Sequence, residues 1–146
     1  MRDRVIALFA LIALGVCGFV SAAQEAIPKN EITGVWRLYD GGLLALTLVV
    51  TDEGGSLTGA IQFYLLRQDS ADAPRTSTPV LPEPLLRVQF DGRTLRFEVS
   101  HRRAHPPETL NDEPARFRVT LTGPNSAEIM NESEPDLAAP MVRSDH

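Results

Sequence analysis

Every second residue is apolar in several segments of this sequence, and this alternation constrains the fold more than any other feature. Leu95–Val99 reads LRFEV and Phe117–Leu121 reads FRVTL, so the polar residues of each segment share one face of an extended chain. A period of two is typical of antiparallel strands with one buried and one solvated face. No segment after residue 30 has a sustained helical period, so an all-β fold is predicted.

Segments of this kind, bounded by Gly, Pro, Asp and Asn, predict about eight strands. The predicted strands are Gly34–Tyr39, Leu43–Thr51, Ser56–Leu66, Leu85–Phe90, Thr94–Ser100, Ala115–Thr122, Ser126–Asn131 and a short Met141–Arg143. The second of them is apolar at nearly every position, which indicates a strand buried on both faces or a contact between subunits.

A tight hairpin is predicted between the fourth and fifth strands. If Gly92-Arg93 forms a two-residue type II′ loop, Phe90 opposes Leu95 and Arg87 opposes Glu98. Apolar side chains then meet apolar ones and an arginine meets a carboxylate, so this register is self-consistent. The face of the fourth strand expected to be buried comprises Leu86, Val88 and Phe90.

The connections between strands are short at one end of the predicted meander and long at the other. The short turns, at what we call the plain end, are Asp52–Gly55, Asp91–Arg93 and Gly123–Asn125. The connections at the other end, the loop-rich end, are Asp40–Gly42, Arg67–Pro84, His101–Pro114 and Glu132–Pro140. Three of those exceed the usual ~4–6 residues. Because binding residues often lie on long loops, the loop-rich end is the predicted functional end, with tolerated insertions as the alternative.

A meander of about eight strands favours an up-and-down barrel, and an antiparallel sandwich is the alternative. Ile32–Trp36 resembles the Gly-x-Trp start of calycin barrels, the group that holds lipocalins, fatty-acid-binding proteins and avidins. Gly55–Gly59 also resembles the second hairpin of avidin-type barrels.

This resemblance implies a small lipocalin-like β-barrel in which Trp36 packs across the closed end and Gly34 lets strands approach each other. Avidin-type barrels line their biotin pocket with several tryptophans, whereas Trp36 is the only tryptophan in this chain. Biotin binding is therefore not implied. No lipocalin ligand is implied either, because fold does not fix function.

The N-terminal segment Met1–Ala23 has the three parts of a secretory signal peptide. Arg2 and Arg4 precede the apolar run Val5–Val20, and small residues follow it up to Ala23. Cleavage after Ala23 is predicted, giving a secreted or periplasmic protein with no membrane span after cleavage. An uncleaved anchor is the alternative, although the run is shorter than the ~20 residues that a spanning helix needs.

The predicted domain organisation is a signal peptide over residues 1–23, a flexible lead over 24–31 and a single β-barrel domain over 32–146. Cys17 is the only cysteine and leaves with the signal. The mature domain is then expected to lack disulfides and thiol chemistry. A lipoprotein modified at Cys17 is the alternative, with Val16 where a lipobox usually has Gly or Ala.

Charge and motifs argue against several functions. The formal net charge of −5 argues against nucleic acid as a partner, because nucleic acid requires a dense basic surface. No serine lies in a nucleophile elbow, and no glycine-rich phosphate loop precedes a helix. A non-enzymatic protein without a cofactor is therefore expected.

The densest polar cluster lies at the start of a long loop at the loop-rich end. His101, Arg102, Arg103 and His105 are candidate ligand-binding residues, together with Arg67 at the start of another long loop. Guanidinium groups present a planar donor fork that suits a carboxylate or a phosphate. This interpretation predicts a site for an anionic group.

Two other interpretations of the cluster remain open. His101, His105 and Glu108 are metal-ligand types, but residues four apart on a strand lie about 13 Å from each other, too far for one ion. Only a loop could close that gap, and no metal site is predicted. The cluster can also be purely structural, with solvated arginines and a loop stiffened by Pro106-Pro107.

The leading hypothesis is a secreted or periplasmic, non-enzymatic β-barrel module that binds a small, partly apolar ligand at its loop-rich end. The alternative is a cell-envelope protein-interaction or structural module with a solid core. A third hypothesis is a metal- or histidine-dependent enzyme that uses His101 and His105. The partner is accordingly a small molecule or an envelope protein.

Overall fold

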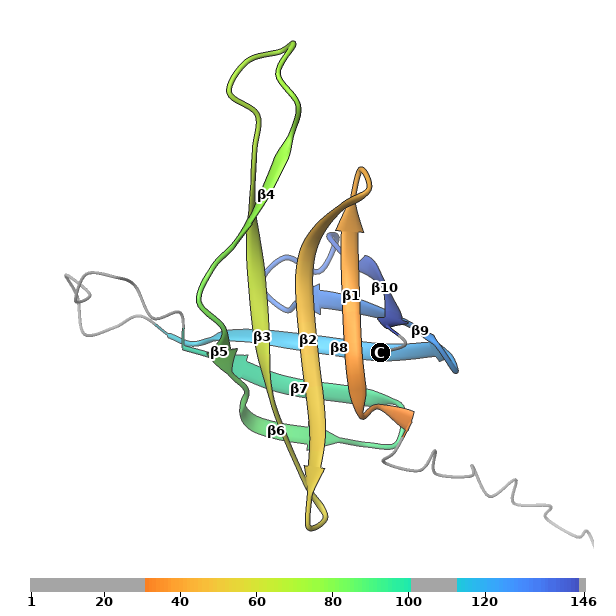
Figure 1. The fold of residues 1–146 in the computed structure, drawn as a ribbon. Helices are drawn as coiled ribbons and strands as arrows, with labels where there is room; N and C mark the ends of the chain where they lie inside the picture. Colours follow the sequence, from red (N-terminus) through yellow and green to blue (C-terminus); the bar gives the residue numbers. More distant parts are fainter. Residues whose placement is uncertain (1–30, 101–112, 145–146) are drawn as a thin grey trace, which may run out of the picture.

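The computed structural model describes residues 31–100 and 113–144, and within these ranges the chain forms ten β-strands and no α-helix (Figure 1). The strands are β1 (Gly34–Asp40), β2 (Leu43–Glu53), β3 (Ser56–Arg67), β4 (Thr76–Pro79), β5 (Glu83–Pro84), β6 (Leu86–Phe90), β7 (Thr94–Val99), β8 (Ala115–Gly123), β9 (Ser126–Asn131) and β10 (Ala139–Ser144). All eight predicted strands are present. No helix long and apolar enough to span a membrane occurs in the described ranges.

The strands form one antiparallel sheet in the order β4-β3-β2-β1-β10-β9-β8-β7-β6. The first and last long strands pair, with Trp36 opposite Arg143. The sheet curls so that β1 and β2 cross in front of β7 and β8, and β2 continues across β6 (Figure 1). The predicted all-β, barrel-like meander is therefore confirmed. Over residues 31–100 and 113–144 the strands belong to one sheet, so the two separate sheets of a sandwich do not form there.

The curled sheet comes together at a seam between β3 and β6. The short strand β5 pairs with β3, and the chain then continues directly into β6, which pairs with β7. At the junction the Leu85 N–H donates to the Gly59 carbonyl oxygen over 3.0 Å. One continuous stretch of chain thus joins the two edges of the sheet.

Apolar side chains fill the space that the sheet encloses. The buried residues are Ile32, Trp36, Leu46, Leu48, Val50, Ile61, Leu85, Leu95, Phe97, Val99, Phe117, Val119, Leu121, Ala127, Ile129 and Met141. None of the described polar or charged residues is buried. Each large apolar side chain contributes about 1.5–3 kcal/mol when it leaves water, so this core is the main source of stability.

Trp36 packs across the plain end, where β1 begins and β10 ends. Its ring is fully buried, and its Nε1–H donates to the Ile32 carbonyl oxygen over 2.9 Å. The Arg143 guanidinium lies over the ring, 4.8 Å from the ring centroid, and also donates to the Glu31 carbonyl oxygen. A cation over an indole face is attracted by the ring quadrupole. Trp36 is therefore a core residue whose ring is covered by the Arg143 guanidinium.

The expectation of a long loop over Arg67–Pro84 is wrong. β4 pairs with the end of β3, from Arg67 opposite Thr76 to Tyr64 opposite Pro79, and the two form a hairpin that projects from the barrel (Figure 1). An ion pair of 2.7 Å between Arg75 and Asp40 ties the hairpin to the β1–β2 turn. The hairpin projects into solvent, so its second strand lacks the buried face that produces alternation.

The predicted hairpin register is correct at the turn and wrong further along. Phe90 opposes Leu95 as predicted, but Leu86, rather than Arg87, opposes Glu98. A β-bulge lies between Leu86 and Gln89, and it adds one residue to β6. The extra residue turns Leu86 to the outer face and leaves Leu85 in the core.

Asp91 holds the β6–β7 turn together. Its side chain accepts hydrogen bonds from the N–H groups of Thr94, over 2.7 Å, and Arg93, over 3.0 Å. These two bonds, followed by the bond from the Arg96 side chain, hold the pKa of the Asp91 carboxyl below its ordinary value.

This lowered pKa predicts a pH-dependent contribution of Asp91 to stability. The charged form is favoured in the folded state, so the contribution is complete above the ordinary pKa of about 4 and disappears as pH falls through the folded value. Asp91→Asn should therefore lower the Tm at pH 7. The difference from the natural protein should shrink in a thermal unfolding series that runs down to about pH 2. A difference that stays constant over this range would contradict the prediction.

Candidate functional site

Most of the predicted site residues lie outside the residues that the structure describes. His101, Arg102, Arg103 and His105 are among these, as is the signal segment Met1–Ala23. Arg67 is described: it is exposed at the end of β3, opposite Thr76 in the projecting hairpin. It lines neither of the hollows described below.

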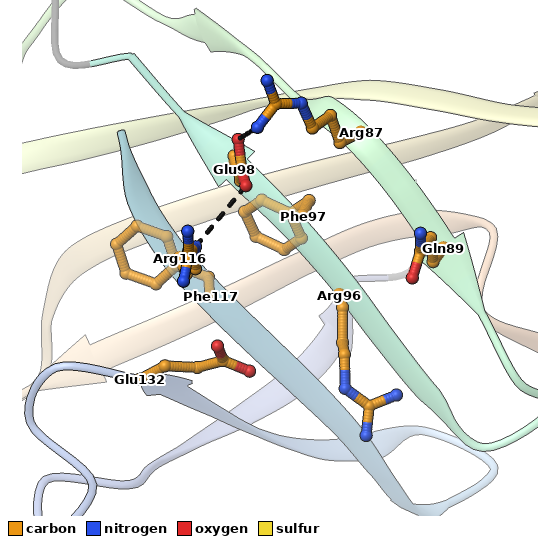
Figure 2. A pocket seen from close by; sticks show the side chains of 8 residues that line it. All are labelled: Arg87, Gln89, Arg96, Phe97, Glu98, Arg116, Phe117 and Glu132. Atoms are coloured by element: carbon orange, nitrogen blue, oxygen red, sulfur yellow. Dashed lines mark hydrogen bonds and ion pairs between the residues drawn. The ribbon is translucent and has the colours of Figure 1, made fainter. Parts of the chain in front are cut away.

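A hollow of about 190 Å³ lies on the outer face of β6, β7 and β8, toward the loop-rich end (Figure 2). We call it the arginine hollow. Its lining residues are Arg87, Gln89, Arg96, Phe97, Glu98, Arg116, Phe117 and Glu132. The rings of Phe97 and Phe117 stack at 5.7 Å and belong to the buried core beneath.

The alternation that builds the core also places charged side chains in rows on the outer face. Glu98 of β7 is opposite Arg116 of β8. Two residues before Glu98 on β7, Arg96 is opposite Arg118 on β8 and opposite Gln89 on β6. The charged lining therefore comes mainly from outward positions of three adjacent strands, and Glu132 joins it from the turn after β9.

Glu98 lies between two arginines (Figure 2). Its Oε2 is 2.8 Å from Nη1 of Arg87, and its Oε1 is 3.5 Å from Nε of Arg116. Only 13% of the Glu98 side chain is exposed, so the carboxylate is sheltered while both guanidinium groups reach into solvent. Both of its oxygens are thus engaged, and they hold the arginines on either side of β7.

Arg96 and Arg118 bring two like charges face to face on neighbouring strands, an arrangement that destabilises a sheet. Nη1 of Arg96 is 3.1 Å from Oδ2 of Asp91. Nη2 of Arg118 is 3.1 Å from the sulfur of Met130, which is a weak and uncharged acceptor. The positive charge of Arg118 is therefore not balanced by a carboxylate among the described residues.

The hollow carries a local positive surplus in an acidic protein. Three guanidinium groups and two carboxylates line it, whereas the whole chain has a formal net charge of −5. Beside the lining, Arg118 adds another positive charge and Asp91, which pairs with Arg96, adds a negative one, so a surplus of one positive charge remains. Arginine clusters of this kind bind carboxylates and phosphates through charge-assisted hydrogen bonds.

Arg87 has a strained backbone. Its φ of 50° lies in the left-handed region, and no other described non-glycine residue has a positive φ. This conformation costs roughly 1–2 kcal/mol for a residue with a Cβ. Strained residues tend to cluster at functional sites. The bulge brings the Arg87 side chain to Glu98 although the two residues are not register partners.

This strain predicts the relative stability of two variants. Arg87→Gly loses an exposed ion pair worth about 0–1 kcal/mol but also relieves the left-handed strain. Arg87→Ala loses the same pair and keeps the strain. The glycine variant should therefore be more stable than the alanine variant by about 1 kcal/mol in urea unfolding. Equal stabilities would contradict the left-handed conformation.

A second hollow, of about 560 Å³, adjoins the first at the loop-rich end. It is lined by Glu113, Pro114, Ala115, Arg116, Asn131, Glu132 and Ser133. Arg116 and Glu132 belong to both hollows, so the two form one recessed surface along the ends of β8 and β9.

The arginine hollow combines guanidinium donors with carboxylates. Over residues 31–100 and 113–144 no three His, Cys, Asp or Glu side chains are grouped so as to hold a metal ion. The lining of the arginine hollow contains donors and carboxylates but no serine, cysteine or histidine.

Sequence reasoning assigned Arg87, Arg96 and Arg116 to outward faces but did not identify them as a site. The available signal was the repetition of arginine at alternate outward positions, as in Arg116 and Arg118. Their clustering depends on the register of three strands, which the local pattern does not give.

No protein-family model, curated protein or solved structure matches this chain.

Proposed function

We propose that this protein is a secreted or periplasmic, non-enzymatic binding module that takes a small, partly apolar ligand at its loop-rich end. The observation that carries the proposal is the position of the two hollows. Both lie at that end, and Arg116 and Glu132 line both. The signal-like segment Met1–Ala23 supports the extracytoplasmic location.

The structure suits binding on the outside of the barrel more than inside it. The interior that the described strands enclose is filled with apolar side chains, whereas the hollows open on the outer surface. Leu86 contributes apolar surface on the same outer face, since the bulge turns it outward opposite Glu98. The ligand therefore meets charged donors and an apolar side chain on one preformed scaffold.

Native mass spectrometry of the protein purified from the extracytoplasmic fraction tests this proposal. We expect a mature chain that begins at Gln24 and carries a small molecule that is lost on denaturation. A chain that retains Met1–Ala23 would overturn the location. A mass equal to that of the bare chain, with no Tm change across a panel of small metabolites, would overturn the ligand-binding function.

A second candidate function is favoured by the projecting hairpin. Leu81 is 83% exposed just after β4, and Leu65 and Val80 are also exposed large apolar residues of this region. Exposed apolar groups that lie together commonly mark protein contacts. The corresponding function is an envelope protein-interaction module. A stoichiometric protein partner that is lost with Leu81→Ser would favour it over the small-molecule function.

A further inference from the structure

We infer that the arginine hollow binds a compact oxyanion, the carboxylate or phosphate group of a small ligand, between Arg96 and Arg116. This inference rests on the proposed function and deepens it, because it assigns the charge of the ligand and the residues that hold it. It differs from the site predicted at His101, Arg102 and Arg103, because its residues lie on the rigid strands β7 and β8.

The charges in and around the hollow favour an anion over a cation. Three arginines and two carboxylates line the hollow: both Glu98 oxygens already face arginines, and the Glu132 carboxylate points toward the space between Arg96 and Arg116 (Figure 2). Asp91, outside the lining, accepts two backbone N–H groups as well as the Arg96 side chain. The arginines are not similarly saturated. A guanidinium has five N–H donors, and Arg96 and Arg116 each use one nitrogen in an ion pair.

The facing arginines supply a second argument. Arg96 and Arg118 oppose each other across β7 and β8, where a pair of like charges destabilises the folded sheet. An anion bound beside Arg96 lowers that repulsion, so binding is coupled to relief of an unfavourable contact. Arginines that only made the surface soluble would not have to lie directly opposite each other on neighbouring strands.

The remaining lining suits the rest of such a group. Gln89, next to Arg96 across β6 and β7, brings an uncharged amide donor to the rim (Figure 2). Leu86 is outside the lining but lies on the same outer face, opposite the lining residue Glu98, so it offers apolar surface for a hydrocarbon chain that extends from the hollow. A ligand with an anionic head and an apolar tail therefore matches both parts of this surface.

The test uses three probes and three variants of the purified protein. The probes are inorganic phosphate, hexanoate and hexylamine, followed by backbone amide NMR titration. Hexylamine has the same chain as hexanoate and the opposite charge. Arg96→Gln and Arg116→Gln each remove one guanidinium from the hollow. Arg75→Gln is the matched control, since Arg75 also pairs with an aspartate, at 2.7 Å, but lies in the projecting hairpin.

We expect an oxyanion to shift the amide signals of β6, β7 and β8, and hexylamine to leave them in place. Each hollow variant should weaken binding roughly tenfold, the effect of one lost charge-assisted hydrogen bond, whereas the control should not. Binding should also weaken as NaCl rises from about 0.02 M to about 0.2 M. Preference for phosphate or for hexanoate identifies which oxyanion the natural ligand carries.

Three results would overturn the inference. They are binding of hexylamine in place of the oxyanions, binding that Arg96→Gln and Arg116→Gln leave unchanged, and no binding of either oxyanion. The proposed function survives each of them if native mass spectrometry still detects a bound small molecule. The two claims therefore fail on different measurements.

Discussion

Trp36→Ala is expected to lower the free energy of unfolding by about 3–5 kcal/mol, a large part of the ~5–15 kcal/mol that holds an ordinary domain folded. The ring is fully buried across the plain end, so its removal leaves a cavity in the core. It also removes the hydrogen bond to Ile32 and the aromatic face beneath Arg143. Nε of Arg143 is already buried without a hydrogen-bond partner. Removal of the indole ring therefore also removes the cation–π attraction that offsets the cost of burying this guanidinium.

Urea unfolding followed by far-UV circular dichroism measures this loss, since the variant has no tryptophan fluorescence. Tyr39→Ala is the control: it truncates a half-exposed aromatic residue of the same strand and should cost less than about 1 kcal/mol. Trp36→Phe keeps much of the volume and should fall between the two. A loss for Trp36→Ala no larger than that of the control would show that the plain end is not a closed core.

Gly59→Ala is expected to cost roughly 3 kcal/mol or more, because the added methyl group has no space. A Cβ at this position would overlap the Val49 carbonyl oxygen and would lie 3.2 Å from Cδ1 of Leu85. The oxygen is part of the β2 backbone and cannot rotate away. The strand must shift instead, which breaks the bond from the Leu85 N–H to Gly59 and opens the β3–β6 seam.

Gly123→Ala provides a matched control for this prediction. Its Cβ would approach only Oγ of Ser126, at 2.7 Å, and a serine side chain can rotate away. We expect the Gly123 variant to lose less than about 1 kcal/mol in urea unfolding. Hydrogen exchange at the Leu85 amide should accelerate in the Gly59 variant and not in the control. Similar losses of stability in both variants would contradict the account of the seam.

The sequence predicted the strands well because each of them has a buried face. Leu95–Val99 and Phe117–Leu121 alternate without exception, and both are strands whose apolar residues are buried. The prediction failed where that physical cause is absent. β4 lies in a projecting hairpin, so burial imposed no alternation on it.

The sequence could not predict whether Leu85 or Leu86 faces the core at the start of β6, because both residues are apolar. Either side chain could be buried in the core, and the bulge places Leu85 there and turns Leu86 outward. A bulge with a left-handed residue is usually marked by glycine, but Arg87 occupies that position here. The local sequence therefore contained no signal for it.

The candidate site was predictable only in part. The outward orientation of Arg96, Glu98 and Arg116 follows from alternation, and it is correct. That these residues line one hollow with Arg87 depends on which strands are neighbours and on a one-residue shift within β6. Such non-local pairing lies beyond what a period of two can indicate.

The pairing of β1 with β10 also has a consequence for the order of assembly. β1 lies between β2 and β10, so it gains its second neighbour only after β10 has been synthesised. Trp36 likewise waits for Arg143 and Met141 to cover the end of the core. Contacts this distant in the chain slow folding. Completion of the curled sheet is therefore a late event that must await β10, rather than a process that keeps pace with synthesis of the earlier strands.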